Sequence, residues 1–166
     1  MASLYAATGS GCFSNAFAYC TGLTSVDLSG LVIVSQGSLN AMFYGCTSLT
    51  TPPKLPATTL AYECYLVMFK GCTSLTTAPS LSATTLAESC YRGMFFNCTS
   101  LTTAPAALPA TTLSSYCYSG MFEGCKKLIT APALPATTLA SYCYSSMFYG
   151  CTSLTTAPEL PATTLI

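Results

Sequence analysis

Cysteine is the residue type whose number and spacing first suggest chemistry in this chain. There are 11 cysteines, in two series that repeat about every 26 residues, and the two members within one unit are eight residues apart. The first series is Cys12, Cys64, Cys90, Cys117 and Cys143, with Ser38 in the remaining position, and the second is Cys20, Cys46, Cys72, Cys98, Cys125 and Cys151. Thiols can form disulfides, bind metals or act as nucleophiles.

The spacing favours a plainer role for these thiols, as small apolar side chains stacked in a core. On a continuous helix, eight residues span about 12 Å, beyond the roughly 7 Å that a disulfide allows between Cα atoms. The odd number leaves at least one thiol without an intramolecular partner. The chain has no Cys-x2-4-Cys pair for structural zinc and no histidine to activate a nucleophile. Disulfides between neighbouring units are the alternative, and no metal or other cofactor is expected.

The charged residues argue against several function classes. Only 6% of the 166 residues are charged, and five basic residues balance five acidic ones. Nucleic-acid binding is not expected, because it depends on neutralising phosphates. No stretch reaches the roughly 20 apolar residues of a membrane-spanning helix. The acidic residues lie at differing positions of the unit, which favours a solvated surface over a catalytic carboxylate pair, so no enzyme is expected; they are Asp27, Glu63, Glu88, Glu123 and Glu159.

An internal repeat organises these residues. The pair Met-Phe begins at residues 42, 68, 94, 121 and 147, with a diverged copy at Ala16-Phe17. The single 27-residue step comes from one extra residue near Ala106-Ala107. Self-similarity at such a period predicts a solenoid of stacked coils. We expect residues 1–15 to form an N-terminal segment or partial first coil, and residues 16–166 to form the solenoid, with its last unit truncated and uncapped.

Each unit divides into two expected elements. Leu60, Cys64 and Met68 are spaced i, i+4 and i+8, which predicts a short helix over residues 59–69. The helix N-caps would be Thr59, Thr85, Thr112 and Thr138, and C-cap positions would be taken by Gly71, Asn97, Gly124 and Gly150. Residues 75–86 predict an extended arm, because threonine suits strands and proline limits their length. The fold class is therefore an α/β repeat solenoid of about six 26-residue units.

Two segments carry a family resemblance. The run Met-Phe-Tyr-Gly-Cys-Thr-Ser-Leu-Thr over residues 147–155, and Ala-Phe-Ala-Tyr-Cys-Thr-Gly-Leu-Thr-Ser-Val over residues 16–26, are similar to the Ala-Phe-x-x-Cys-x-x-Leu-x-x-Ile unit of the BspA-like leucine-rich repeat proteins of bacterial surfaces. The resemblance implies a right-handed leucine-rich-repeat coil and an adhesive role. It also implies an extracellular or cell-surface location, although residues 1–15 lack the pattern of a signal peptide.

Paired threonines form the candidate binding face. In a solenoid they become ranks of hydroxyls and methyls, as on ice-binding surfaces, although threonine also fills strand and cap positions for local reasons. The candidate residues are Thr50, Thr51, Thr76, Thr77, Thr102, Thr103, Thr155 and Thr156. A second recurring set is expected to pack at the core or its edge, with sugar stacking by exposed rings as the alternative; it comprises Tyr65, Tyr91, Tyr118 and Tyr144.

The repetition itself predicts the kind of function. A face that repeats in every coil matches a repeating ligand or a copy of itself, whereas an enzyme needs a cluster of unlike groups. We therefore expect a non-catalytic structural or adhesive protein that associates head to tail into filaments or stacks on neighbouring repeats of a longer chain. A host surface protein or glycan is a further expected partner. The alternative is a binding module for a repetitive ligand such as a glycan, a surface or ice.

Overall fold

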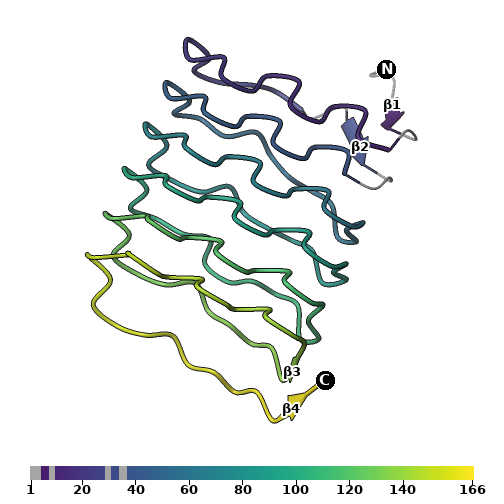
Figure 1. Ribbon diagram of the computed structural model, residues 1–166, viewed down its shortest axis with the longest axis vertical. Helices are drawn as coiled ribbons and strands as arrows, with labels where there is room; N and C mark the ends of the chain where they lie inside the picture. Colours follow the sequence, from purple (N-terminus) through teal and green to yellow (C-terminus); the bar gives the residue numbers. More distant parts are fainter. Residues whose placement is uncertain (1–4, 8–9, 29–30, 34–36) are drawn as a thin grey trace.

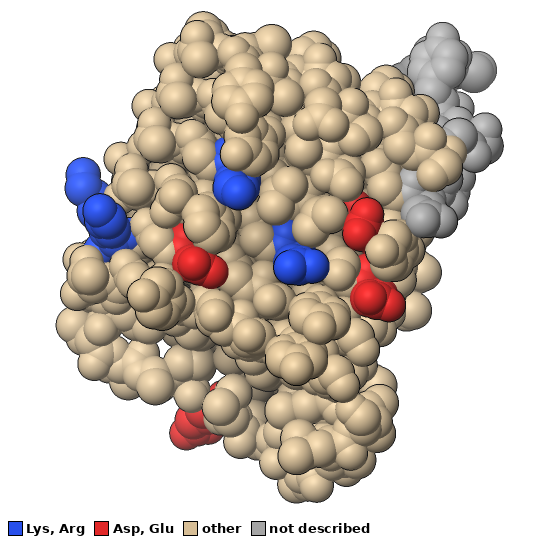
Figure 2. All heavy atoms as spheres, viewed as in Figure 1, with Lys and Arg blue, Asp and Glu red and all other residues tan. Residues whose placement is uncertain are grey.

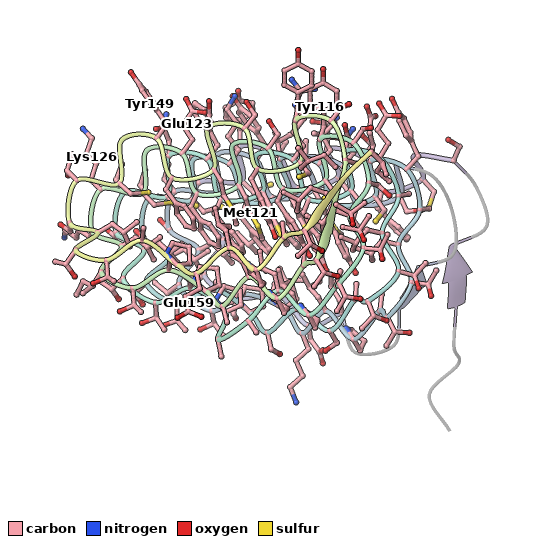
Figure 3. The ribbon with its side chains drawn as sticks, turned by 90° about the horizontal axis from the view of Figure 1, so that it is seen from below. Tyr116, Met121, Glu123, Lys126, Tyr149 and Glu159 are labelled. Atoms are coloured by element: carbon pink, nitrogen blue, oxygen red, sulfur yellow. The ribbon has the colours of Figure 1, made fainter. Side chains whose placement is uncertain are left out.

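The chain forms a stack of similar coils. The structure is a computed structural model that describes residues 5–7, 10–28, 31–33 and 37–166 (Figure 1). Successive coils follow one another along the longest axis, and each coil consists of two layers with side chains packed between them (Figure 3). The repeat solenoid expected from the sequence is therefore present.

One layer is extended and is joined from coil to coil by short parallel pairings. Strand β1 (Tyr5–Ala7) pairs with β2 (Leu31–Ile33), and β3 (Thr138–Leu139) pairs with β4 (Thr164–Leu165). Single bridges link the remaining coils, and they are Ser25–Thr51, Leu55–Leu81, Thr59–Thr85, Thr77–Thr103, Thr103–Thr130, Ala107–Ala133 and Thr112–Thr138. The strands stay short because prolines such as Pro79 and Pro105 have no N–H to donate.

The inserted residue is visible in the pairing register. Thr103 pairs with Thr130, whereas Ala107 pairs with Ala133. The first step is 27 residues and the second is 26, so the extra residue lies between the two bridges in the fourth coil. The extended layer absorbs this insertion and then resumes the common register, as the sequence predicts for the Ala106-Ala107 region.

The expected helices are wrong: the described residues contain no helix. Residues 62–71 form consecutive turns instead, and every fourth residue has a positive φ angle, namely Glu63 at 52°, Val67 at 46° and Gly71 at 75°. The same three positions have a positive φ in each of the other coils, from Gly11, Asn15 and Tyr19 onwards. We call these turn-rich segments the turn ribbon; it comprises residues 10–23, 37–49, 62–75, 88–101, 115–128 and 141–154. The rest of each coil is the extended layer.

Hydrogen bonds in the turn ribbon alternate between local and inter-coil partners. The N–H groups of Arg92 and Met94 donate to the carbonyls three residues earlier, over 3.2 Å in both cases. The N–H groups of Tyr91, Gly93 and Phe95 donate instead to carbonyls of the next coil, at 2.8–3.0 Å. Successive N–H groups therefore find partners without a helical ladder, which satisfies the backbone.

A four-residue turn repeat explains why this segment resembles a helix in sequence. Buried side chains recur in pairs four residues apart, as at Cys64-Tyr65 and Met68-Phe69, which gives the i, i+4 spacing of a helical face. The turn repeat needs a positive φ at every fourth residue, which glycine and asparagine adopt most readily, although Glu63, Val67 and Tyr116 also occupy such positions. The expected C-caps Gly71, Asn97 and Gly124 occupy the third such position.

The expected N-cap threonines have another role, because there is no helix to cap. Thr59 pairs with Thr85 in the extended layer. The N–H groups of Thr84 and Thr85 both donate to the carbonyl of Thr58 one coil earlier, at 3.0 and 3.2 Å. The same double donation is made by residues 50 and 51, 102 and 103, 137 and 138, and 163 and 164. The paired threonines thus mark recurring pairs of backbone hydrogen bonds between neighbouring coils.

The core between the layers consists of stacked columns of identical side chains. Six phenylalanines, one per coil from Phe17 to Phe148, stack with ring centroids 5.5–5.8 Å apart. Tyr65, Tyr91, Tyr118 and Tyr144 form a second column at 5.6–6.0 Å, which confirms the expected core or core-edge packing. Met121 lies between the two layers (Figure 3). Each coil therefore contributes the same side chains to one continuous core.

Candidate binding surfaces

The cysteines lie mainly in the core, and all 11 thiols are free. Nine are buried, which confirms the expected packing role, whereas Cys12 and Cys20 are exposed. The thiols of Cys72 and Cys98 donate to the carbonyls of Phe43 and Phe69 in the preceding coil, at 3.1 Å. Equivalent contacts are made by Cys46, Cys125 and Cys151. This weak hydrogen bond gives a physical reason for cysteine at the position.

Burial also suppresses ionisation of these thiols. It raises the pKa of Cys64, Cys72, Cys117 and Cys125 to about 12 in each case, because a thiolate in the core would lack solvation. A nucleophilic or metal-binding cysteine needs the thiolate form. Across the described part of the chain, no group of three or more cysteine or carboxylate side chains is arranged to hold a metal ion. The buried cysteines therefore act as apolar residues that pack in the core.

The threonines of the candidate face lie together on the extended layer. All eight are exposed except Thr102, which is half-buried. The hydroxyls of Thr50 and Thr102 donate to the carbonyls of Thr24 and Thr76, at 3.3 and 3.1 Å. The first threonine of each of these two pairs thus helps to join neighbouring coils.

The second threonine of each pair continues the rank. Thr51, Thr77, Thr103 and Thr156 occupy this position, and Thr130 completes it in the fifth coil, giving an exposed threonine in five consecutive coils. Parallel bridges join Thr77 to Thr103 and Thr103 to Thr130, so these members are separated by about 4.8 Å, the distance between paired strands. Ile129 replaces the first threonine of the fifth coil and is 54% exposed, so only the second position forms an uninterrupted rank.

The turn ribbon presents a different surface, which the sequence analysis did not identify. Lys70 places its ammonium over the rings of Tyr44 and Phe96, 5.4 and 4.6 Å from their centroids. The Arg92 guanidinium lies 5.3 Å from the centroid of Tyr116, and Tyr116 stacks on Tyr142 at 4.9 Å. The signal was available in the sequence, since the positions where the copies differ are those whose side chains point outward from the ribbon.

The acidic residues are distributed as expected for a solvated surface. Asp27, Glu88 and Glu159 are exposed, and Glu63 and Glu123 are half-buried. The Glu63 carboxylate beside Tyr62 raises the pKa of that tyrosine. Glu123 lies on the ribbon side of the molecule and Glu159 on the extended side, so they do not face each other as a catalytic pair (Figure 3).

The extended layer has shallow hollows beside the inserted residue. Two of them share Ala106, and the lining of one includes Pro105, Ile129 and Ala131. Their walls are mainly alanine, proline and threonine, with Glu159 as the charged side chain. This composition offers apolar contact and few directional groups.

Among the described residues, no helix has the length and apolar character needed to cross a bilayer.

The comparisons with known proteins identify the repeat. The BspA type leucine rich repeat region matches the chain in six copies, over residues 12–128 and 68–163. Neither a curated protein nor a solved structure matches the chain significantly. The match covers most of the chain and agrees with the stacked coils and their 26-residue register. The chain therefore belongs to the BspA-type leucine-rich repeat family.

Proposed function

We propose that this chain is a non-catalytic structural or adhesive array of a bacterial surface or an extracellular assembly. The observation that carries the proposal is the threonine rank of the extended layer, exposed at Thr51, Thr77, Thr103, Thr130 and Thr156. A rank with a spacing of about 4.8 Å offers the same hydroxyl and methyl in every coil. Such a face matches a partner that also repeats, such as a linear polysaccharide or an ordered surface.

Association through the coil faces is the second part of the proposal. Phe17 is 38% exposed, whereas Phe43, Phe69 and Phe95 in the same column are fully buried. Leu165 and Ile166 are 81% and 70% exposed at the other end of the stack. Apolar surface of this kind favours contact with another coil, supplied by a second copy or by neighbouring repeats of a longer chain. Repeated contacts of this type build open filaments.

A matched pair of variants tests the threonine rank. The triple variant Thr77→Val, Thr103→Val and Thr130→Val removes three hydroxyls from the rank and keeps the side-chain shape. The control Thr47→Val, Thr73→Val and Thr99→Val makes the same change on the turn ribbon. Binding to a panel of immobilised linear polysaccharides is expected to fall in the first triple variant and to persist in the control. Equal binding by both would show that the rank is not the adhesive surface.

Ice binding is the second candidate, because ranked threonines present a regular array of hydroxyls and methyls. A thermal-hysteresis measurement on the unaltered chain tests it directly. Activity that disappears in the Thr77, Thr103 and Thr130 variant supports ice binding, and its absence in the unaltered chain eliminates it. Sedimentation over a concentration series tests coil-face association, and a strictly monomeric chain at high concentration would contradict that part of the proposal.

A further inference from the structure

The turn ribbon carries opposite charges at its two edges. Glu63 and Glu88 belong to the edge where the ribbon begins, and Lys126 and Lys127 belong to the edge where it ends. Figure 3 shows the two edges at opposite sides of the layer, with Tyr116 at the first and Lys126 at the second. In Figure 2 acidic side chains gather near one edge of this face and basic side chains near the other, with both signs between them.

Aromatic rings and cations occupy the middle of the same face. Lys70 is held between the rings of Tyr44 and Phe96, and Arg92 lies over Tyr116. Rings and cations fixed in this way lose little side-chain freedom when a partner binds. Tyrosine and arginine are also the side chains most enriched at the energetic centres of protein interfaces.

The charges and rings on this face favour some binding partners over others. A polyanion is disfavoured, because Glu63, Glu88 and Glu123 lie on the same layer as Lys70 and Arg92. Sugar stacking is disfavoured at Tyr116, because Arg92 covers one face of the ring and Tyr142 covers the other. A second copy of the chain fits better, since one face already contains both halves of a complementary charge pattern.

We propose that two copies pack turn ribbon against turn ribbon about a two-fold axis that runs close to the direction of coil stacking. Lys126 and Lys127 belong to the fifth coil, whereas Glu63 and Glu88 belong to the third and fourth. The axis is therefore inclined to the stacking direction, and it turns one copy over so that its Glu63 and Glu88 edge faces the Lys126 and Lys127 edge of the other. The contact is isologous, so it closes at a dimer. It is lateral and independent of contacts between coil faces, which would produce open-ended species and would not involve these four charges.

Charge reversal tests the pairing. Sedimentation equilibrium of the full chain should show a dimer, below the concentrations at which coil-face contacts add larger species. This dimer should weaken as salt rises from about 0.05 to 0.5 M, because screening shortens the range of charge interactions. The variant Glu63→Lys with Glu88→Lys and the variant Lys126→Glu with Lys127→Glu should each dissociate, with dimer affinity reduced on the order of tenfold or more. Circular dichroism should match the unaltered chain, since Glu88, Lys126 and Lys127 are exposed and Glu63 is half-buried.

Mixing the two charge-reversal variants is the decisive experiment. In a mixed pair each reversed edge again faces an edge of opposite charge, so the equimolar mixture should form a heterodimer although neither variant forms a homodimer. A control that places positive charge on the extended layer, Ser80→Lys with Glu159→Lys, should dimerise like the unaltered chain. A monomeric unaltered chain, a dimer insensitive to both reversals, or a mixture that fails to associate would each overturn the proposal. Dimers lost equally in the control would assign the contact to the extended layer.

Discussion

The two layers of each coil satisfy their backbone hydrogen bonds in different ways, and their outer surfaces also differ. The turn ribbon alternates local turns with inter-coil hydrogen bonds, and its outward positions vary from Tyr44 to Lys70 to Phe96 in successive coils. The extended layer uses isolated bridges, and its outward positions repeat as threonine. The ribbon therefore combines a uniform interior with a varied exterior. The extended layer repeats one exposed threonine in coil after coil, although the exposed position after its proline changes from Lys54 to Ser80 to Glu159. A varied face can recognise one surface, and a repeated face can match only a repeating one.

The largest expected effect is loss of the fold at alkaline pH, driven by the ribbon. Burial raises the folded-state pKa of Cys64, Cys72, Cys117 and Cys125 to about 12, against about 8.5 when unfolded. The stability of the folded state is unaffected below the pKa of the thiols in the unfolded chain, and it falls as the pH rises towards their pKa in the folded chain. Each ionising thiol lowers the free energy of unfolding by about 1.4 kcal/mol per pH unit in that window, so the four together remove a large part of a typical stability of 5–15 kcal/mol.

Urea unfolding at a series of pH values measures this loss. The free energy of unfolding should decline steeply above about pH 9, and the decline should be shallower in the variant Cys64→Ala with Cys117→Ala. A stability that stays constant to about pH 11 would show that the thiols are not buried as described.

The next effect separates the two sides of the ribbon. Phe95 is fully buried in the phenylalanine column, with ring centroids 5.6 and 5.5 Å from Phe69 and Phe122. Its neighbour Phe96 points outward and is half-buried. Phe95→Ala should cost about 3–5 kcal/mol of unfolding free energy, and Phe96→Ala should cost much less. Denaturant unfolding of both variants measures the difference. Similar losses of unfolding free energy would contradict the placement of Phe95 inside the ribbon and Phe96 outside it.

A smaller effect is expected from the turns themselves. Gly71 has a φ of 75°, so Gly71→Ala should cost about 1–2 kcal/mol through backbone strain alone. Gly22 lies at the end of a ribbon segment without a positive φ, and a Cβ there would meet nothing within 4 Å. Gly22→Ala is therefore the matched control and should be neutral or slightly stabilising. Thermal unfolding measures both, and the reverse order would argue against the repeated turns.

The smallest effect concerns the extended layer. The Thr102 hydroxyl donates to the Thr76 carbonyl over 3.1 Å in a solvent-exposed position. Thr102→Val should lower the unfolding free energy by about 0.5–1 kcal/mol. Thr84→Val is the comparison, because the Thr84 N–H donates to the carbonyl of Thr58 while its hydroxyl has no hydrogen-bond partner among the described residues. A larger loss for Thr84→Val would show that the hydroxyl of Thr102 does not link the coils.

The period and the core could be predicted from the sequence because they depend on spacing, and the extended layer could be predicted because threonine favours strands and proline limits their length. The repeat placed Cys64, Met68 and Phe69 in one buried layer, and the one-residue insertion near Ala106 gave the change of register. The helix failed for a specific reason. Turns that recur every four residues generate the same i, i+4 spacing as a helical face, so periodicity cannot separate the two.

The distinguishing information was in the small residues. A helix of this length tolerates one glycine at its end, whereas the fourth coil has Gly93 four residues before Asn97, and the fifth has Gly120 four residues before Gly124. Outward chemistry on the ribbon was missed for a related reason. A helical assignment gave no rule for which variable positions share a face, so the contacts of Lys70 and Arg92 with aromatic rings depended on knowing the turns.

The most direct test of the two-layer account is the set of 13Cα secondary chemical shifts over residues 62–71, measured on the isotopically labelled chain. The account predicts chemical shifts that repeat with a period of four residues, with the values typical of left-handed backbone at Glu63, Val67 and Gly71. Uniformly helical shifts through this segment would contradict it and would restore the helix suggested by the sequence.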